Sequence, residues 1–140
     1  MIDDFTGPYR FLSNFWPARV CLDGAEYPTV EHAYQAAKTL GYAAREWIRK
    51  SGTPGRAKRR GKQVPVRADW DTVRVDTMRR LLAQKFASGS DLAARLLATG
   101  DSELVEGNAW GDRFWGVSGG TGQNWLGRLL MERRAVSRKG

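Results

Sequence analysis

Cysteine and histidine are almost absent from this chain, whose 140 residues include only Cys21 and His32. A single cysteine excludes an intramolecular disulfide, and one cysteine with one histidine cannot form a Cys/His zinc cage. We therefore expect neither a metal nor a cofactor. Cys21 lies between Val20 and Leu22 in a predicted strand, a setting more typical of a small buried apolar residue than of a nucleophile.

Long hydrophobic runs are also absent, because no apolar stretch approaches the roughly 20 residues that a transmembrane helix needs. Residues 1–5 contain no basic stretch followed by an apolar core, so no secretory signal is indicated and a cytoplasmic location is expected. The hydrophobic content of 41% and the six tryptophans indicate a packed globule. A chain of this length predicts a single domain, residues 1–140, with one core.

Acidic residues are scarce in one part of the chain, although the formal net charge is only +8 overall. Residues 45–62 contain a single acid, Glu46, against eight basic residues. These are Arg45, Arg49, Lys50, Arg56, Lys58, Arg59, Arg60 and Lys62. Such a stretch is consistent with a phosphate-bearing partner, and charge alone leaves nucleic acid, a nucleotide and simple solubility open. Signatures of helix-turn-helix, zinc-finger and RNA-recognition domains are absent.

Helical periodicity dominates the rest of the chain. Residues 19–27 predict a β-hairpin with a type I′ Asp23-Gly24 turn, and Thr29 is the expected cap of the next helix. Further helices are expected after Gly41, from Pro54, over 69–87 with Asp69 as cap, over 92–98 and over 125–136, with a short strand at 103–106. The predicted fold class is α+β, a predominantly helical single domain with a small β-hairpin.

The helix predicted from residue 30 contains three polar residues, Glu31, Gln35 and Lys38, at positions i, i+4 and i+7. This spacing places them on one stripe, with about 10 Å along the axis between Glu31 and Lys38. A sugar ring fits between two such side chains, with Gln35 as a hydrogen-bonding neighbour. The alternative is an ordinary amphipathic surface helix.

A glycine-rich segment, residues 110–124, precedes the last predicted helix. It is neither a Walker loop nor a dinucleotide-binding fingerprint. Its tryptophans favour an ordered ligand loop over a disordered tip, and the loop is expected to offer bare backbone N–H groups to an anion at the start of the helix. Trp115 is a candidate stacking platform, with core packing as its alternative and Trp110 as its competitor.

Four segments in this order resemble the YbiA-like, or NADAR, family over nearly the whole chain. They are Phe11–Phe15, Pro28–His32 with Gln35, Ala36 and Lys38, Asp69–Trp70, and Phe114–Gly116 with Gly122, Asn124, Leu126 and Gly127. The resemblance implies a compact, largely helical fold with a small β component and N-glycosidase activity on a ribosyl compound. One branch of the family cleaves phosphoribosylated pyrimidine intermediates of riboflavin synthesis, and the other removes ADP-ribose from guanine in nucleic acid.

Both branches break the bond between ribose C1′ and a nitrogen, which implies catalytic roles for Glu31 and Lys38. Positive charge develops at C1′, and the Glu31 carboxylate suits that charge. A neutral Lys38 amine is able to attack C1′, open the ring and hold the sugar as an imine that water hydrolyses. In the rival scheme Lys38 anchors phosphate and Glu31 activates water.

The remaining predicted site residues are polar or glycine residues within the matching segments. They are Ser13, Asn14, His32, Gln35, Trp115, Gly116, Gly122 and Asn124. Four of them have ordinary alternatives: Asn124 as a helix cap, His32 as a hydrogen-bonded structural residue rather than a proton donor, and Ser13 and Asn14 as buried groups with structural partners.

Val117 follows Gly116, where riboflavin-type members of the family tend to have a carboxylate. Together with the basic stretch, this departure favours removal of ADP-ribose from guanine in DNA or RNA. Hydrolysis of a phosphoribosylaminopyrimidine is the second hypothesis, and a non-catalytic ADP-ribose-binding module is the third. The expected partner is therefore an ADP-ribosylated nucleic acid or a ribosyl-phosphate metabolite, with no membrane and no metal.

Overall fold

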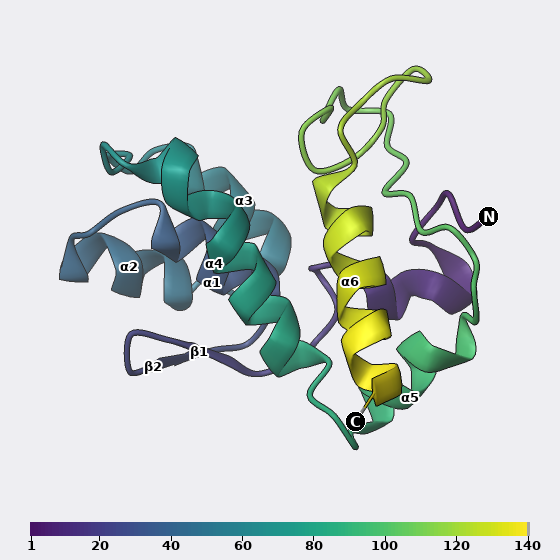
Figure 1. Ribbon diagram of the computed structural model, residues 1–140. Helices are drawn as coiled ribbons and strands as arrows, with labels where there is room; N and C mark the ends of the chain where they lie inside the picture. Colours follow the sequence, from purple (N-terminus) through teal and green to yellow (C-terminus); the bar gives the residue numbers. More distant parts are fainter. Residues whose placement is uncertain (140) are drawn as a thin grey trace. The chain divides into compact units, whose positions relative to one another are not determined.

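The computed structural model describes residues 1–139 and has the predicted α+β class, with helices dominant and one small sheet (Figure 1). The elements in chain order are η1 (Gly7–Leu12), β1 (Val20–Leu22), β2 (Ala25–Tyr27), α1 (Val30–Ala37), α2 (Tyr42–Arg49), α3 (Pro54–Gly61), α4 (Trp70–Lys85), α5 (Asp91–Ala98) and α6 (Trp125–Lys139). The chain forms two compact units. Unit 2 is the continuous segment 14–85, and unit 1 combines residues 1–13 with the segment from Phe86 onward.

The hairpin of unit 2 agrees with the sequence-based prediction. Strands β1 and β2 are antiparallel, with Val20 opposite Tyr27. The turn residues Asp23 and Gly24 have φ angles of 48° and 84°, the positive values that a type I′ turn requires. Cys21 is exposed. The side-chain amide of Gln84 hydrogen-bonds to both backbone groups of Cys21, donating to its carbonyl at 2.9 Å and accepting from its N–H at 2.7 Å. Cys21 is therefore not the buried apolar residue that was expected.

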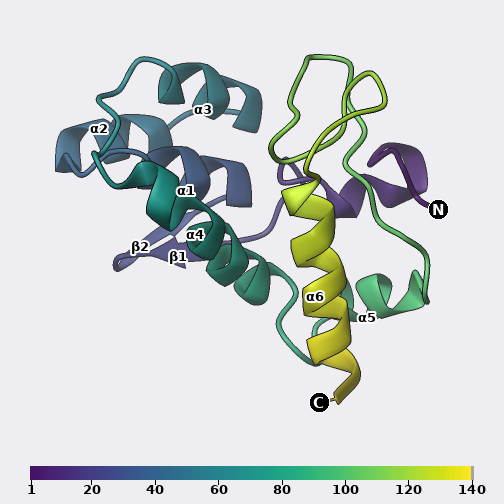
Figure 2. The same cartoon turned by 45° about the horizontal axis from the view of Figure 1, so that its top comes forward.

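Helix α1 lies in the core of unit 2 and packs against α2, α3, α4 and both strands (Figures 1 and 2). All eight of its residues are buried, the polar ones included. The alternative of an amphipathic surface helix is therefore wrong. Thr29 caps the helix as predicted, since its Oγ1 accepts from the N–H of His32 at 3.1 Å.

Helix α4 begins after Asp69, whose carbonyl accepts from Val73 N at 3.1 Å while its carboxylate pairs with Arg67 at 2.6 Å. Its apolar stripe buries Met78, Leu81 and other side chains, as the periodicity predicts. The last residue of α4, Lys85, is also buried, with only 3% of its surface exposed. Burial lowers the pKa of Lys85 to about 7.

This buried lysine makes stability depend on pH. The unfolded chain holds the Lys85 proton up to a pKa of about 10.4, whereas the folded chain loses it at a pKa of about 7, so between these two values the unfolded state binds more protons. We expect the free energy of unfolding to rise by on the order of 2 kcal/mol between pH 7 and pH 9 because of Lys85. Urea denaturation of Lys85→Met at both pH values should lack this increment, and Lys50→Met should retain it. An equal rise in all three proteins would contradict the assignment.

Unit 1 contains η1, α5, the glycine-rich segment and α6, and α5 packs against α6. Ser90 caps α5 by accepting from Ala93 N at 3.1 Å. The strand predicted at 103–106 is wrong: an isolated parallel bridge joins Leu104 to Ile2, and a second isolated parallel bridge joins Gly107 to Val117.

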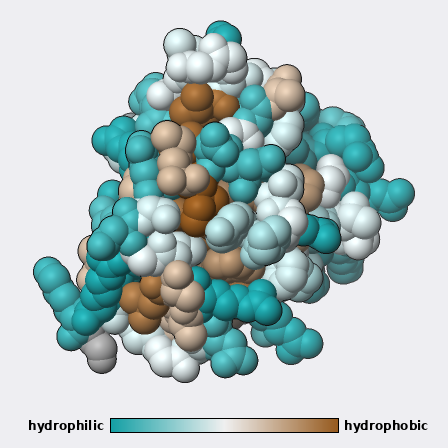
Figure 3. Space-filling model, turned by 90° about the vertical axis from the view of Figure 1, so that its right-hand side faces the viewer, coloured by the Kyte–Doolittle hydropathy of each residue, from teal (hydrophilic) through white to brown (hydrophobic). Residues whose placement is uncertain are grey.

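No helix among residues 1–139 is both long enough and apolar enough to span a membrane. On the face drawn in Figure 3, apolar residues appear as small separate patches among hydrophilic side chains. Small patches of this kind are normal for protein surfaces exposed to water.

Candidate functional site

Glu31 is held in place at the start of α1 by both its backbone and its side chain. Its N–H donates to the carbonyl of Asn14 at 3.1 Å. Gln35, one turn later, donates from Nε2 to the Glu31 carboxylate at 2.9 Å. Glu31 is only 7% exposed, and its place in the first turn of the helix suits a negative charge. The structure therefore presents a buried, oriented carboxylate.

Two amide oxygens near Glu31 have no hydrogen-bond partner among residues 1–139. They are Oε1 of Gln35, which is 4% exposed, and Oδ1 of half-buried Asn14. The Nδ2 of Asn14 contacts the sulfur of Met78 at 3.7 Å. Buried acceptors without partners are rare, because each one forfeits a hydrogen bond to water.

Lys38 follows the last turn of α1 and is half-buried, with its Nζ 5.7 Å from the centre of the Tyr34 ring. Burial is the main cause that lowers its pKa below the ordinary lysine value. The charge of Glu31 opposes this shift, and the charges of Lys62 and Lys58 add to it. A lowered pKa increases the fraction of neutral amine at a given pH, which is the form that acts as a nucleophile.

His32 uses both ring nitrogens within the protein. Nε2 lies 2.9 Å from the carbonyl of Ser51, which only accepts, so the ring hydrogen is on Nε2 and Nδ1 accepts from the Thr29 hydroxyl at 2.7 Å. The side chain is 1% exposed, and burial lowers its pKa, so the neutral form is favoured. This geometry favours the structural alternative for His32 over a role as proton donor.

Helix α3 packs against α1, with Gly61 facing the side chain of Gln35. A Cβ on Gly61 would overlap Oε1 of Gln35 and approach its Cβ to 3.1 Å. The absence of a side chain at Gly61 therefore allows Gln35 to keep its orientation toward Glu31. No sequence pattern indicated this role, because an isolated glycine in a basic helix resembles a simple helix terminus.

We expect Gly61→Ala to reduce kcat by about 10-fold or more, because the displaced Gln35 amide no longer orients the Glu31 carboxylate. The matched control is Gly55→Ala in the same helix, where the nearest atom to an added Cβ is 3.8 Å away. Steady-state kinetics on the preferred N-ribosyl substrate, with melting temperatures to confirm folding, would measure the effect. Equal kcat values for the two variants would contradict this role of Gly61.

The glycine-rich segment of unit 1 is ordered by its own side chains, as the ligand-loop interpretation requires. Oδ1 of Asp112 accepts from the N–H groups of Phe114 and Trp115 at 3.1 and 3.0 Å. Asn108 accepts from Asp112 N at 3.0 Å and donates to Asp112 O at 2.9 Å. Trp115 is half-buried and meets the Phe114 ring edge-on at 4.9 Å. Its stacking role stays a prediction.

The expected bare N–H groups at the start of α6 are absent from this region. The N–H groups of residues 123–126 all donate to loop carbonyls, for example Trp125 to Phe114 at 3.1 Å and Leu126 to Trp115 at 2.9 Å. These four N–H groups are therefore not the bare donors that were expected at the start of the helix. A Cβ on Gly122 would overlap the carbonyl of Gly116, so these two glycines permit close packing within the loop.

Asn124 uses its side-chain amide to bind the preceding segment. Its Oδ1 accepts from Glu106 N at 2.9 Å, and its Nδ2 donates to Leu104 O at 2.9 Å. Its φ angle of 53° is unusual for a residue with a side chain, and asparagine tolerates it better than most. Ser13 terminates η1, donating from its N–H to Arg10 O at 3.0 Å. Substrate contacts of Ser13 and Asn124 remain predictions.

The predicted site residues are divided between the two units. Unit 2 contains Glu31 and Lys38 with Asn14, His32 and Gln35, whereas unit 1 contains Ser13, Trp115, Gly116, Gly122 and Asn124. Within unit 2 the structure brings together the carboxylate, the amide and the amine that the sequence placed on one stripe.

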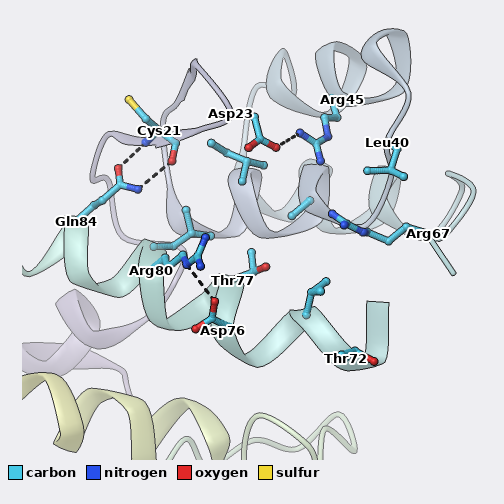
Figure 4. A pocket seen from close by; sticks show the side chains of 14 residues that line it. Cys21, Asp23, Leu40, Arg45, Arg67, Thr72, Asp76, Thr77, Arg80 and Gln84 are labelled. Atoms are coloured by element: carbon cyan, nitrogen blue, oxygen red, sulfur yellow. Dashed lines mark hydrogen bonds and ion pairs between the residues drawn. The ribbon is translucent and has the colours of Figure 1, made fainter. Parts of the chain in front are cut away.

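A separate pocket of about 610 Å³ in unit 2 lies between the hairpin, the end of α1 and α4 (Figure 4). Its lining includes none of the predicted site residues. Its arginines are neutralised by carboxylates: Arg45 contacts Asp23 at 2.6 Å, and Arg80 contacts Asp76 at 3.0 Å. Because both of these arginines are paired, neither offers a free positive charge to an anionic substrate.

Comparison with known proteins identifies the family. The NADAR domain model matches residues 3–136. N-glycosidase YbiA of Escherichia coli K12 is 44% identical over 131 residues, covering 90% of this chain and 80% of that protein. An N-glycosidase of Nostoc punctiforme is 38% identical over 133 residues, covering 91% and 85%.

Two further relatives extend the comparison. A riboflavin biosynthesis protein of Vibrio vulnificus is 40% identical over 126 residues, which cover 88% of this chain and 34% of that protein. The NMR structure of the Escherichia coli protein YbiA superposes with a TM-score of 0.85 at 39% identity, covering 99% of this chain and 85% of that chain. This chain therefore belongs to the NADAR family, and its N-glycosidase relatives make it a hydrolase of N-glycosyl bonds.

Proposed function

We propose that this hydrolase cleaves the bond between ribose C1′ and a base nitrogen, and that its substrate is ADP-ribose attached to guanine in DNA or RNA. The observation that carries the proposal is the buried Glu31 carboxylate on the same helix as the half-buried Lys38, whose pKa is lowered by burial. We further propose that residues 1–140 act as one NADAR domain.

The reaction begins with loss of the base. As the C1′–N bond breaks, its electron pair leaves with the base, which takes up a proton, and the Glu31 carboxylate stabilises the positive charge at C1′. The neutral Lys38 Nζ then bonds to C1′ and releases its proton. Opening of the ring breaks the bond between C1′ and the ring oxygen, which is protonated, and leaves an imine.

Water completes the cycle. It adds to the imine carbon, the C1′–Nζ bond breaks, and the free sugar and the Lys38 amine are released. In the rival scheme Glu31 takes a proton from water, which attacks C1′ directly, and Lys38 binds phosphate. Both schemes consume one water and yield the same sugar and free base. They differ in whether Lys38 forms a covalent bond to C1′.

The second candidate substrate is a phosphoribosylaminopyrimidine of riboflavin synthesis. It is supported by the names of the relatives from Vibrio vulnificus and from Zea mays, both described as riboflavin biosynthesis proteins. Two features argue against this substrate. Val117 occupies the position at which riboflavin-type members tend to have a carboxylate, and residues 45–62 are strongly basic. Val117 lies half-buried, and its N–H donates to Glu106 O at 2.9 Å.

A mass-spectrometric assay on both substrates side by side tests the proposal. Release of ADP-ribose with restored guanine, lost in Glu31→Gln and Lys38→Ala, is the expected result. Turnover of the pyrimidine compound alone would replace the substrate with the second candidate. If neither compound is consumed but ADP-ribose binds with a saturable heat, the third hypothesis, a binding module, would replace the proposal.

A further inference from the structure

Six of the seven acidic residues of unit 2 pair with arginines that lie outside helix α3, and the seventh, Glu31, is buried in α1. The pairs are Glu26 with Arg19, Asp23 with Arg45, Glu46 with Arg49, Asp69 with Arg67, Asp71 with Arg74, and Asp76 with Arg79 and Arg80. Residues 47–68, which include the whole of α3, contain no acidic residue. Among residues 1–139, Arg56, Arg59 and Lys62 therefore have no ion pair.

These three basic residues line the outer face of α3. Arg56, Arg59 and Lys62 are exposed and follow one another at intervals of three residues, which places them along one side of the helix. Ala57 and Gly61, on the opposite side, are buried where α3 packs against α1 (Figure 2). Successive members of the row are separated by about 4.5 Å along the helix axis. The row therefore presents three positive charges to solvent.

An exposed aromatic ring adjoins this row. Trp47 of α2 is 40% exposed, although tryptophan is highly buried on average. Arg60 of α3 donates from Nη1 to the Trp47 carbonyl at 2.6 Å, and its guanidinium lies 4.8 Å from the centre of the Trp47 ring. Arg60 follows Arg59 and lies one turn after Arg56, so the stacked pair lies beside the charged row. A flat indole with a guanidinium provides a surface on which an unpaired base can stack.

The chemistry of these groups favours a nucleic-acid strand over an acidic protein as the partner. Two of the three charges in the row are guanidinium groups, whose planar forks bind phosphate oxygens through two parallel hydrogen bonds. A row of charges suits a polymer that carries one negative charge per nucleotide. The Trp47–Arg60 pair suits a polymer that also carries exposed bases, and bases are exposed in a single strand rather than in a duplex.

We propose that Trp47, Arg56, Arg59, Arg60 and Lys62 form one surface, the α2–α3 surface, which binds the single strand that flanks the modified nucleotide. The inference rests on the proposed function, because it assigns the place where the polymer part of that substrate binds. Helix α3 packs directly against α1, and helices in contact have axes about 8–10 Å apart. A strand on the outer face of α3 therefore passes within a few nucleotides of α1.

Fluorescence anisotropy with an unmodified single-stranded oligonucleotide tests this surface without requiring turnover. The test variant combines Arg56→Gln, Arg59→Gln and Lys62→Gln. The matched control combines Arg19→Gln, Arg79→Gln and Arg80→Gln. The control removes the same net charge from exposed arginines of the hairpin and α4, so a difference between the two proteins reports the place of the charges rather than their number. Melting temperatures confirm that each variant is folded.

We expect the test variant to weaken binding by about 30-fold or more at low salt, and the control to stay close to wild type. The slope of log K against log salt concentration should fall by about 2 in the test variant, since each phosphate contact on a single strand contributes about 0.7. Trp47→Ala should weaken binding by about 10-fold and leave the slope unchanged.

Three results would overturn the α2–α3 surface. The first is an equal loss of affinity in the test variant and the control, and the second is the absence of salt-dependent binding by the wild type. The third is displacement of the oligonucleotide by polyglutamate at an equal charge concentration with no effect of Trp47→Ala, which would make an acidic protein the partner instead.

Activity on two substrates separates this surface from the proposed function. The substrates are ADP-ribosylated guanosine as a mononucleoside and the same modification within an oligonucleotide. We expect the test variant to lose kcat/KM only on the oligonucleotide. Loss of oligonucleotide binding in the test variant, with no cleavage of either substrate by the wild type, would retain the surface and refute the proposed function. Cleavage of both substrates by the test variant at wild-type rates would retain the function and overturn the surface.

Discussion

Replacing Lys38 with arginine should reduce kcat by at least about 10³-fold, equivalent to roughly 4 kcal/mol of transition-state stabilisation. Arginine preserves the positive charge but cannot become the neutral amine that forms an imine with C1′. Lys38→Ala should be equally inactive, since both variants lack the nucleophile. The measurement is the single-turnover rate at saturating substrate.

The control for this experiment is Lys50→Arg, which makes the same exchange at an exposed position directly after α2 and should retain full activity. Substantial turnover in Lys38→Arg, with loss only in Lys38→Ala, would contradict the covalent scheme. That result would support the rival, in which the charge of Lys38 anchors phosphate and water attacks C1′ directly.

The second large effect is expected for Glu31→Gln, which should lower kcat by on the order of 10²–10³-fold. The amide keeps the shape of the side chain and can still accept the hydrogen bond from Gln35 at 2.9 Å, so the loss reports charge rather than packing. In the proposed reaction, this variant removes the negative charge that stabilises the positive charge developing at C1′. Steady-state kinetics with a stability check would measure the loss.

The same variant has a signature in its pH profile. The Glu31 charge raises the pKa of Lys38, so removing it lowers that pKa further. The rising limb of kcat/KM, which reports the free enzyme, should then move to lower pH as the neutral Lys38 amine becomes available earlier. A limb that stays in place or moves to higher pH would contradict the coupling between Glu31 and Lys38.

Local sequence signals predicted the elements well. The hairpin follows from the Asp23-Gly24 dipeptide, and the start of α1 follows from the capping residue Thr29. These signals succeed because a turn or a cap depends on a few neighbouring residues. The strand predicted at 103–106 failed because a strand also needs a continuous partner, whereas this segment pairs with Ile2 at one end and with Val117 at the other.

The site was predictable only in part. The i, i+4, i+7 spacing and the family resemblance indicated Glu31 and Lys38. The burial of the whole of α1, by contrast, results from packing against α2, α3 and α4, which periodicity does not reveal. The close contact of Gly61 with Gln35 was missed for the same reason, since it depends on how one helix meets another.

The most direct test of the Glu31–Lys38 site is to trap the intermediate. Borohydride added during turnover of the preferred N-ribosyl substrate reduces an imine to a stable secondary amine, and peptide mapping by mass spectrometry locates the adduct. The account predicts a substrate-derived sugar on Lys38, absent from Lys38→Arg. An adduct on a different lysine, or none while the enzyme turns over under the same conditions, would contradict it.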